Sequence, residues 1–319
     1  MTTGHRPVML EEAVAALAPV DGDRVVDATF GGGGHARRVL RELGPDGELV
    51  GIDRDPAAVD RASGLLGDRR FRFVSGKYDE VLWGMVEGGE RVDAILFDLG
   101  PSSFQIDEPE RGFSYAGEGP LDMRMDPRSG VSAAEFLNTV ELRELSRVLS
   151  EYGDVPRGQA RRVAREVENR RPLETTSDLY EAVRAAVGWV ERGGNPAKRV
   201  FQAVRVRVND EIGGLQRALG AAERLLVPGG RLVAIAFHSG EDRLVKRFIS
   251  DREGRCVCPP ELPVCACGAR PILRRGVVRR PSDTEVQENP RSASARLRSA
   301  IRTSEPLEPL APREARGYP

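Results

Sequence analysis

The 319-residue sequence contains few aromatic residues (5%), only four cysteines and no long uninterrupted apolar run. Because no apolar stretch approaches the ~18 residues that a membrane-spanning helix needs, we expect no membrane span. The first residues, Met-Thr-Thr-Gly-His, lead to two glutamates before any apolar run begins, so we expect no signal peptide. Together these absences predict a cytoplasmic protein.

The four cysteines lie close together, in two C-x-C pairs with six residues between the pairs: Cys256, Cys258, Cys265 and Cys267. Disulfides are disfavoured in a reducing cytosol. Four thiolates in two close pairs can enclose a tetrahedral Zn²⁺ ion. The segment therefore predicts a structural zinc site, and reduced thiols and disulfides are the alternatives.

Lysine is also scarce, and arginine supplies nearly all of the positive charge. The formal net charge of −1 neither favours nor excludes a nucleic-acid partner. Basic side chains outnumber acidic ones in the segments 157–207 and 243–302, so two basic faces are conceivable. Genomic base composition is the alternative explanation for the arginine content.

The most informative motif is an apolar run, a run of four glycines and a second apolar run that ends in an acidic residue. The first part covers residues 25–35 and includes Asp27, Gly33, Gly34 and His35, and the second ends at Asp53. This order is typical of a βαβ unit that binds an adenosine-containing cofactor. Glycine lets the main chain approach a ligand closely, and an acidic residue after the second strand can accept hydrogen bonds from ribose hydroxyls.

Two cofactors fit this motif. Gly31-x-Gly33-x-x-Ala36 satisfies the dinucleotide pattern, so an NAD-dependent oxidoreductase is one alternative. Asp27 favours S-adenosylmethionine, because a carboxylate at the end of the first strand repels a pyrophosphate and attracts a cationic amino-acid group. A glycine turn without any ligand is the structural alternative.

The spacing of apolar segments predicts an α/β fold. Strands are expected at 24–29, 49–53, 71–74, 94–98, 231–237 and 296–302. The interval between residues 98 and 231 is far longer than one crossover needs and has helical periodicity, including one long helix over 199–226. We therefore divide the chain into a sheet domain (1–107 and 196–302), an inserted helical domain (108–195) and a disordered proline-rich tail (303–319).

Polar side chains follow the fourth and fifth predicted strands, at the edge where open α/β sheets bind ligands. Asp98 begins the segment Asp98-Leu99-Gly100-Pro101-Ser102, which is similar to the loop of methyltransferases that act on exocyclic amines. His238 follows the fifth strand. We assign Asp98, Ser102 and His238 to the catalytic group; an N-capping role for the serine and a structural hydrogen bond for the histidine are the alternatives.

Seven segments resemble, in order, the signature blocks of one bacterial family, the ribosomal RNA small subunit methyltransferase H family, also called MraW. They are residues 5–12, 27–35, 51–55, 98–103, 111–114, 120–126 and 237–243. The resemblance implies a Rossmann-like S-adenosylmethionine methyltransferase sheet with an inserted helical domain that helps to recognise RNA. It also implies methylation of N4 of a cytidine in 16S rRNA, on the free RNA or the small ribosomal subunit.

Carried over by motif, the cofactor contacts implied by the resemblance are Gly33, Gly34, His35, Asp53, Tyr78, Asp98 and Gln105; the pattern of the glycine loop itself adds Asp27. The expected chemistry is direct in-line methyl transfer, in which catalysis is mainly positioning. A carbon-5 cytosine methyltransferase would need a thiolate beside the cofactor, whereas the cysteines are clustered far along the chain. A non-catalytic RNA-binding protein remains the alternative from another class, and the oligomeric state stays open, a dimer included.

Overall fold

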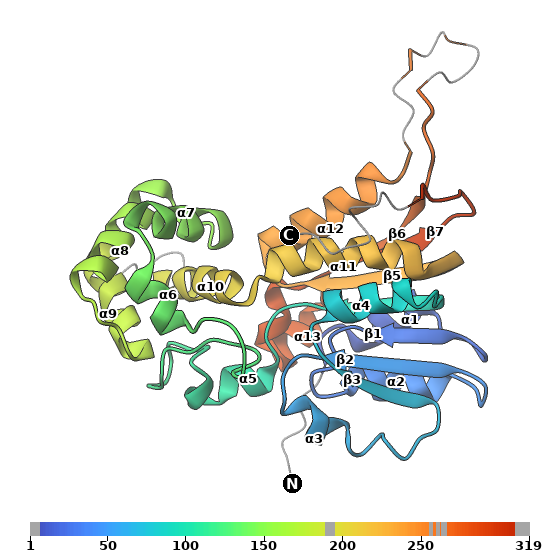
Figure 1. The fold of residues 1–319 in the computed structure, drawn as a ribbon, viewed down its shortest axis with the longest axis horizontal. Coiled ribbons are helices and arrows are strands. Elements are labelled where there is room, and N and C mark those ends of the chain that lie inside the picture. The colour runs from blue at the N-terminus through green and yellow to red at the C-terminus, as the bar shows by residue number, and fades with distance from the viewer. Residues whose placement is uncertain (1–6, 189–194, 255–257, 260–261, 263–266, 310–319) are drawn as a thin grey trace. The chain divides into compact units, whose positions relative to one another are not determined.

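The computed structural model describes residues 7–188, 195–254, 258–259, 262 and 267–309 (Figure 1). The chain divides into two compact units. The first combines residues 1–100 with 212–319, and the second comprises residues 101–211. The sequence-based limits of the insertion, 108 and 195, lie inside the second unit.

The first unit is built on one seven-stranded sheet with the strand order β3-β2-β1-β4-β5-β7-β6. The five strands from β3 to β5 pair in parallel, whereas β7 is antiparallel to both β5 and β6. The strands are β1 (Arg24–Asp27), β2 (Glu48–Asp53), β3 (Phe71–Ser75), β4 (Val92–Asp98), β5 (Leu226–Ala236), β6 (Leu273–Arg279) and β7 (Arg296–Arg302). This is the predicted Rossmann-like α/β class.

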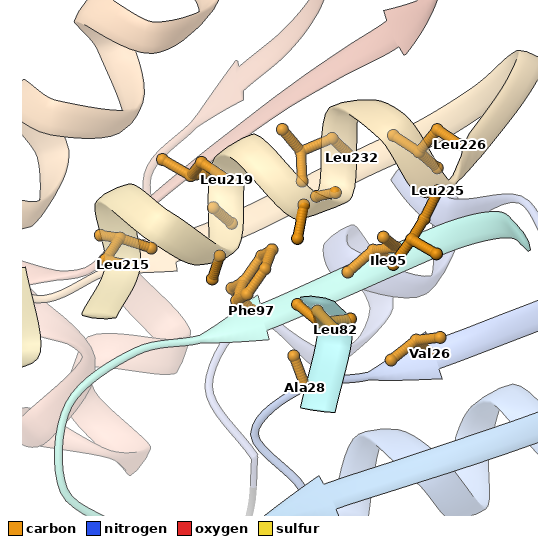
Figure 2. Packing of buried hydrophobic residues seen from close by; sticks show 14 of the residues in the cluster. Val26, Ala28, Leu82, Ile95, Phe97, Leu215, Leu219, Leu225, Leu226 and Leu232 are labelled. Carbon is orange, nitrogen blue, oxygen red and sulfur yellow. The ribbon is translucent and has the colours of Figure 1, made fainter. Parts of the chain in front are cut away.

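Helices bury both faces of this sheet, because apolar strand residues alternate between two clusters. Val26, Ile95 and Phe97 belong to one cluster, and Val25 and Leu96 belong to the other. The first cluster includes residues of α4 (Tyr78–Glu87), α11 (Glu211–Leu225) and α12 (Ser239–Asp251), and Figure 2 shows leucines of α11 packed over Phe97 and Ile95. The second includes residues of α1 (Leu10–Leu17), α2 (Gly34–Glu42) and α3 (Ala58–Ala62).

The second unit is helical and has an apolar core of its own, in which Leu121, Leu145, Val163 and Val204 are almost fully buried. Side-chain caps fix two of its helix starts, at Ser132 and at Thr175. Its helices are α5 (Ser103–Asp107), α6 (Ala133–Thr139), α7 (Leu142–Tyr152), α8 (Arg157–Asn169), α9 (Thr176–Val187) and α10 (Pro196–Asn209), with a short 3₁₀ turn at Pro109–Arg111.

Two predicted elements are wrong in detail. The single helix over 199–226 is two helices, α10 and α11, because Asp210 between them adopts a left-handed conformation (φ 50°) that ends the first. The fifth strand, predicted over 231–237, begins earlier: β5 starts at Leu226 and contains a shift in its pairing with β4, and Gly229 there has φ 88°.

The edge strand β6 was not predicted. It is followed by α13 (Asp283–Glu288), by a 3₁₀ turn at Pro290–Ser294 and by β7. Within the segment predicted as a tail, Thr303 Oγ1 donates to the Pro271 carbonyl, and the Glu305 carbonyl accepts from Arg302 (2.6 Å). Residues 310–319 of that tail lie outside the described residues. In the part of the chain that the structure describes, no helix is long and apolar enough to cross a membrane.

Candidate functional site

Three carboxylates end three neighbouring strands at one edge of the sheet. Asp53, Asp27 and Asp98 are the last residues of β2, β1 and β4, which are adjacent in the strand order. Because these strands are parallel, their carboxyl ends meet at the same edge. The structure thus brings together the three acidic residues that the sequence singled out.

Asp27 is buried and only partly satisfied. Its side chain is 2% exposed, and Oδ1 accepts a hydrogen bond from the Thr29 backbone N–H (3.2 Å). Its Oδ2 has no hydrogen-bond partner among the described residues. Burial, with a smaller contribution from the charge of Asp53, raises the pKa of Asp27 to about 7. An unpartnered buried carboxylate oxygen is costly in isolation, so it marks a position where a cationic or hydrogen-donating ligand group would be stabilised.

Asp53 organises the glycine loop. Its Oδ2 accepts from the Gly31 N–H (2.7 Å), and its Oδ1 accepts from the Asp55 N–H (2.9 Å). Arg61 supports the same loop, because its Nε donates to the Gly31 carbonyl and its guanidinium bonds the buried Asp55. Burial raises the pKa of Asp53, although the two backbone N–H donors oppose that rise. Sequence reasoning missed the part played by Arg61.

Packing within the protein, as well as ligand approach, explains why residues 33 and 34 are glycines. Gly33 has φ +72°, and a Cβ there would lie 2.6 Å from the Phe30 ring. A Cβ on Gly34 would lie 2.1 Å from Cγ of Pro7. Both glycines are therefore required by packing within the unit, and their contact with a cofactor stays a prediction.

Asp98 is held on both sides by groups of the first unit. Its backbone N–H donates to Thr29 Oγ1 (2.6 Å), and its Oδ2 lies 3.5 Å from Nδ1 of His35. Its Oδ1 is buried and has no hydrogen-bond partner within the described residues. Burial and the neighbouring carboxylates of Asp27 and Glu241 raise the pKa of Asp98 well above its usual value.

Tyr78 and His238 also belong to the first unit. Tyr78 is the first residue of α4, and its ring meets Phe97 edge to face, with 5.8 Å between the ring centroids. His238 caps α12, since its Nδ1 accepts from the Gly240 N–H (3.2 Å). The structural hydrogen bond that the sequence left as an alternative for His238 is thus present, and a catalytic role for this residue stays a prediction.

Glu241 is a buried residue of this edge to which the sequence gave no role. It is 2% exposed, and its Oε2 accepts from the backbone N–H groups of Phe237 (2.8 Å) and His238 (3.2 Å). Its Oε1 lies 3.3 Å from His238 Nε2. A glutamate three residues after an N-cap is the available sequence signal, but that pattern gives no hint that its charge acts on Asp98.

Ser102 and Gln105 lie in the second unit and form one capping box at the start of α5. Ser102 Oγ accepts from the Gln105 N–H (3.3 Å), and Gln105 Oε1 accepts from the Ser102 N–H (3.0 Å). The N-capping alternative for Ser102 is therefore realised. Of the proposed zinc ligands, Cys258 and Cys267 are described, whereas Cys256 and Cys265 lie outside the described residues.

Comparison with known proteins gives matches over nearly the whole chain. A ribosomal RNA small subunit methyltransferase H from Rubrobacter xylanophilus is 76% identical over 302 residues, which cover 95% of this chain and 97% of that protein. Its namesake from Thermomicrobium roseum is 48% identical and covers 95% and 94% of the two chains. A solved rRNA methylase from Streptococcus thermophilus aligns over 92% and 94% of the chains at 11% identity, with a TM-score of 0.42. A model described as the MraW methylase family matches residues 2–303, and the chain belongs to that family.

Proposed function

We propose that this protein transfers a methyl group from S-adenosylmethionine to the exocyclic N4 of a cytidine in 16S rRNA. One observation carries the proposal: two buried carboxylate oxygens at the ligand edge of the sheet, Asp27 Oδ2 and Asp98 Oδ1, have no partner among the described residues. The curated relatives are named for the small-subunit ribosomal RNA.

The donor set fits S-adenosylmethionine better than NAD. Asp27 Oδ2 offers a buried anion to a cationic ammonium or sulfonium group and would repel a pyrophosphate. Asp53 already accepts two backbone N–H groups, and a carboxylate has about four lone-pair positions, so it retains acceptors for ribose hydroxyls. When bound, the cofactor supplies an activated methyl group, so the protein needs no covalent intermediate.

Asp98 has the properties that a base amine requires. The lone pair of an exocyclic nitrogen is delocalised into the ring, so the site must hold an acceptor against its N–H groups while the nitrogen is positioned for attack. Asp98 Oδ1 is a buried acceptor with no partner in the described chain, and the raised pKa of Asp98 makes it a stronger base than an ordinary aspartate. We assign to Asp98 the proton that leaves N4.

A row of arginines on α8 supports RNA as the substrate. Arg157, Arg161 and Arg165 are exposed at intervals of four residues, about 6 Å along the helix axis. Within the described chain, none of the three has an ion pair or a side-chain hydrogen bond. Unpaired guanidinium groups in a row suit the phosphates of a nucleic-acid backbone. We assign RNA contact to these three residues.

The deciding experiment uses small ribosomal subunits from a bacterial strain that lacks this methylation. The purified protein is incubated with these subunits, or with naked 16S rRNA, and isotopically labelled S-adenosylmethionine, and the RNA is digested to nucleosides for mass spectrometry. Labelled N4-methylcytidine is the expected product. Label on carbon 5 of cytidine, label on a nucleoside other than cytidine alone, or no label with either substrate would each contradict the proposal. A thermal shift with S-adenosylmethionine against NAD tests the cofactor independently.

A further inference from the structure

The imidazole of His35 faces protein groups at both ring nitrogens. Its side chain is buried, 5% exposed, on the first turn of α2. Nε2 lies 3.2 Å from the backbone carbonyl oxygen of Val8, and Nδ1 lies 3.5 Å from Asp98 Oδ2. Both ring nitrogens are therefore occupied by protein groups, and a contact of His35 with a nucleoside cofactor would be made by its backbone.

The Val8 contact determines the tautomer. A carbonyl oxygen only accepts hydrogen bonds, so Nε2 must carry a hydrogen. In the neutral ring Nδ1 then bears a lone pair, which would face a lone pair of an ionised Asp98. Two acceptors repel each other. One proton between Nδ1 and Oδ2 replaces this repulsion by a hydrogen bond, either from a charged imidazolium to the carboxylate or from a neutral carboxyl to the imidazole.

We propose that His35 and Asp98 share one bound proton, and that His35 is a positioning residue that controls the ionisation of Asp98. The pair titrates as a unit, so its apparent pKa values belong to both residues together. Because Oδ2 is occupied by the shared proton, Oδ1 is left as the acceptor that faces the reaction.

The charges around the pair favour retention of that proton. Asp27 at the end of β1 and Glu241 on α12 both act on Asp98 in the direction that raises its pKa, and burial acts in the same direction. His238 Nε2 lies 3.3 Å from Oε1 of Glu241. On α2, two residues after His35, Arg37 donates to the Gly32 carbonyl. A buried site with this excess of carboxylates stabilises an additional proton.

The consequence for the reaction rests on the proposed function. As the N4–methyl bond forms from the nitrogen lone pair, the bond between sulfur and carbon breaks with its electrons left on sulfur, and one N4–H proton must leave. Asp98 Oδ1 accepts it, so the pair passes from one bound proton to two. Loss of one proton to water then restores the resting pair.

The first test needs no methylation activity. The chain has only three histidines, so ¹⁵N spectra of the histidine rings are simple to assign with single variants. We expect His35 to carry hydrogen on Nε2 and to keep a protonated or hydrogen-bonded Nδ1 above pH ~6.5, where an ordinary histidine has lost its proton. In Asp98→Asn the pH at which Nδ1 of His35 loses its proton should fall by at least one unit. The His238 signals should stay unchanged, which checks the fold.

Two wild-type results would overturn the shared proton: an unbonded Nδ1 lone pair above pH 6.5, or hydrogen on Nδ1 with none on Nε2. Identical His35 titrations in wild type and Asp98→Asn would do the same. Because these spectra are recorded on the protein alone, their outcome is independent of whether N4 of cytidine is the target.

The second test uses two matched variants. His35→Asn places an amide near the position of Nδ1, which can bond Asp98 but holds no titrating proton, and His35→Gln places an amide near Nε2, within reach of Val8. We expect both to move the inflection of the single-turnover pH profile, measured at saturating S-adenosylmethionine, by at least one pH unit. A wild-type inflection in either variant would show that His35 does not control Asp98.

Discussion

Asp53 accepts one hydrogen bond at each carboxylate oxygen, from the Gly31 N–H of the glycine loop and from the Asp55 N–H, and both oxygens retain a lone pair for a ligand. We expect Asp53→Ala to weaken S-adenosylmethionine binding by roughly ten- to a hundredfold, because a hydrogen bond to a charged group contributes about 1.5–3 kcal/mol. Isothermal titration calorimetry measures the change directly.

Asp60→Ala is the matched control for that experiment, since Asp60 is an exposed acidic residue on the neighbouring helix α3. It should leave the dissociation constant unchanged. Because Asp53 also holds Gly31 in place, melting curves of both variants must accompany the titrations. An Asp53→Ala protein that folds and binds the cofactor as wild type does would remove Asp53 from the cofactor site.

Asp98 is predicted to act in the chemical step. Asp98→Asn preserves the shape of the side chain but replaces one buried acceptor oxygen by a donor and abolishes its basicity. We expect the single-turnover rate to fall by at least a hundredfold, within the range for loss of a general base, while the melting temperature changes little. A rapid-quench assay at saturating cofactor gives the rate. An unchanged rate would leave Asp98 with a structural role alone.

At the scale of single residues, the sequence predicted which side chains lie at the ends of strands but not which groups they contact. The edge location of Asp27, Asp53 and Asp98 follows from their places after apolar strands, and the structure confirms it. The contacts of Gly34 and His35 depend on Pro7 and Val8, which approach from a segment 27 residues away in the sequence from each partner. No local pattern encodes such an approach, so the buried pairing of His35 with Asp98 could not be predicted.

The helix α8 offers a test of substrate binding at the scale of one element. Replacing Arg157, Arg161 and Arg165 together with Gln should weaken RNA binding and reduce the slope of log affinity against log salt. The reduction should be about 0.7–0.9 for each phosphate that the variant no longer neutralises. Binding titrations at several salt concentrations measure both quantities. Cofactor affinity should not change.

Two other arginines of the second unit supply controls. Arg147 on α7 is exposed but forms ion pairs with Glu144 and Glu151, so Arg147→Gln should not alter the salt slope. Arg162 on α8 donates to the Ala186 carbonyl and is left intact, because its loss would disturb the contact between α8 and α9. An unaltered salt slope in the triple variant would mean that the three arginines form a solvent-exposed helix face that does not bind RNA.

The cysteine segment is predicted to bind one zinc ion. If the four thiolates of Cys256, Cys258, Cys265 and Cys267 ligate the metal, binding and local folding are coupled, and Cys265→Ser should lower the melting temperature while methyl transfer is affected only indirectly. Elemental analysis of protein purified without added metal measures the zinc content. Less than about a tenth of an equivalent, with four freely titrating thiols, would identify them as reduced cysteines.

Among the elements, those with an apolar face were predictable and those without one were not. Strands β1, β2 and β4 are mostly buried and apolar, and β3 is partly buried; the predicted limits of all four are close to the observed ones. Among the described strands, β6 pairs with β7 alone. It exposes most of its residues and contains three arginines, so it lacks the periodic apolar signal of a strand. Asp210 has helical neighbours on both sides, and only its backbone conformation reveals the break between α10 and α11.

For the molecule as a whole, Asp27 links ligand binding to stability. Its pKa rises from 3.8 in the unfolded chain to about 7 in the fold, so the folded state binds more protons between these values. The free energy of unfolding therefore falls as the pH rises from about 4 to about 7, and the full penalty is present above pH 7. That penalty is at most roughly 4 kcal/mol. A cationic ligand group beside Oδ2 would offset it.

Asp27→Asn should consequently stabilise the ligand-free protein at pH 8 by up to a few kcal/mol, because the neutral amide avoids burial of a charge. The gain should shrink as the pH falls and vanish below pH 4, where the carboxyl is neutral in both states. The same substitution should weaken S-adenosylmethionine binding, since stability at a ligand site is often opposed to function. Urea melts at pH 5 and pH 8, with exposed Asp60→Asn as the control, measure the difference. Equal stability of Asp27→Asn and wild type at pH 8 would show that the carboxylate is ionised in the fold without cost, and the assignment of a cation to Asp27 would lose its physical basis.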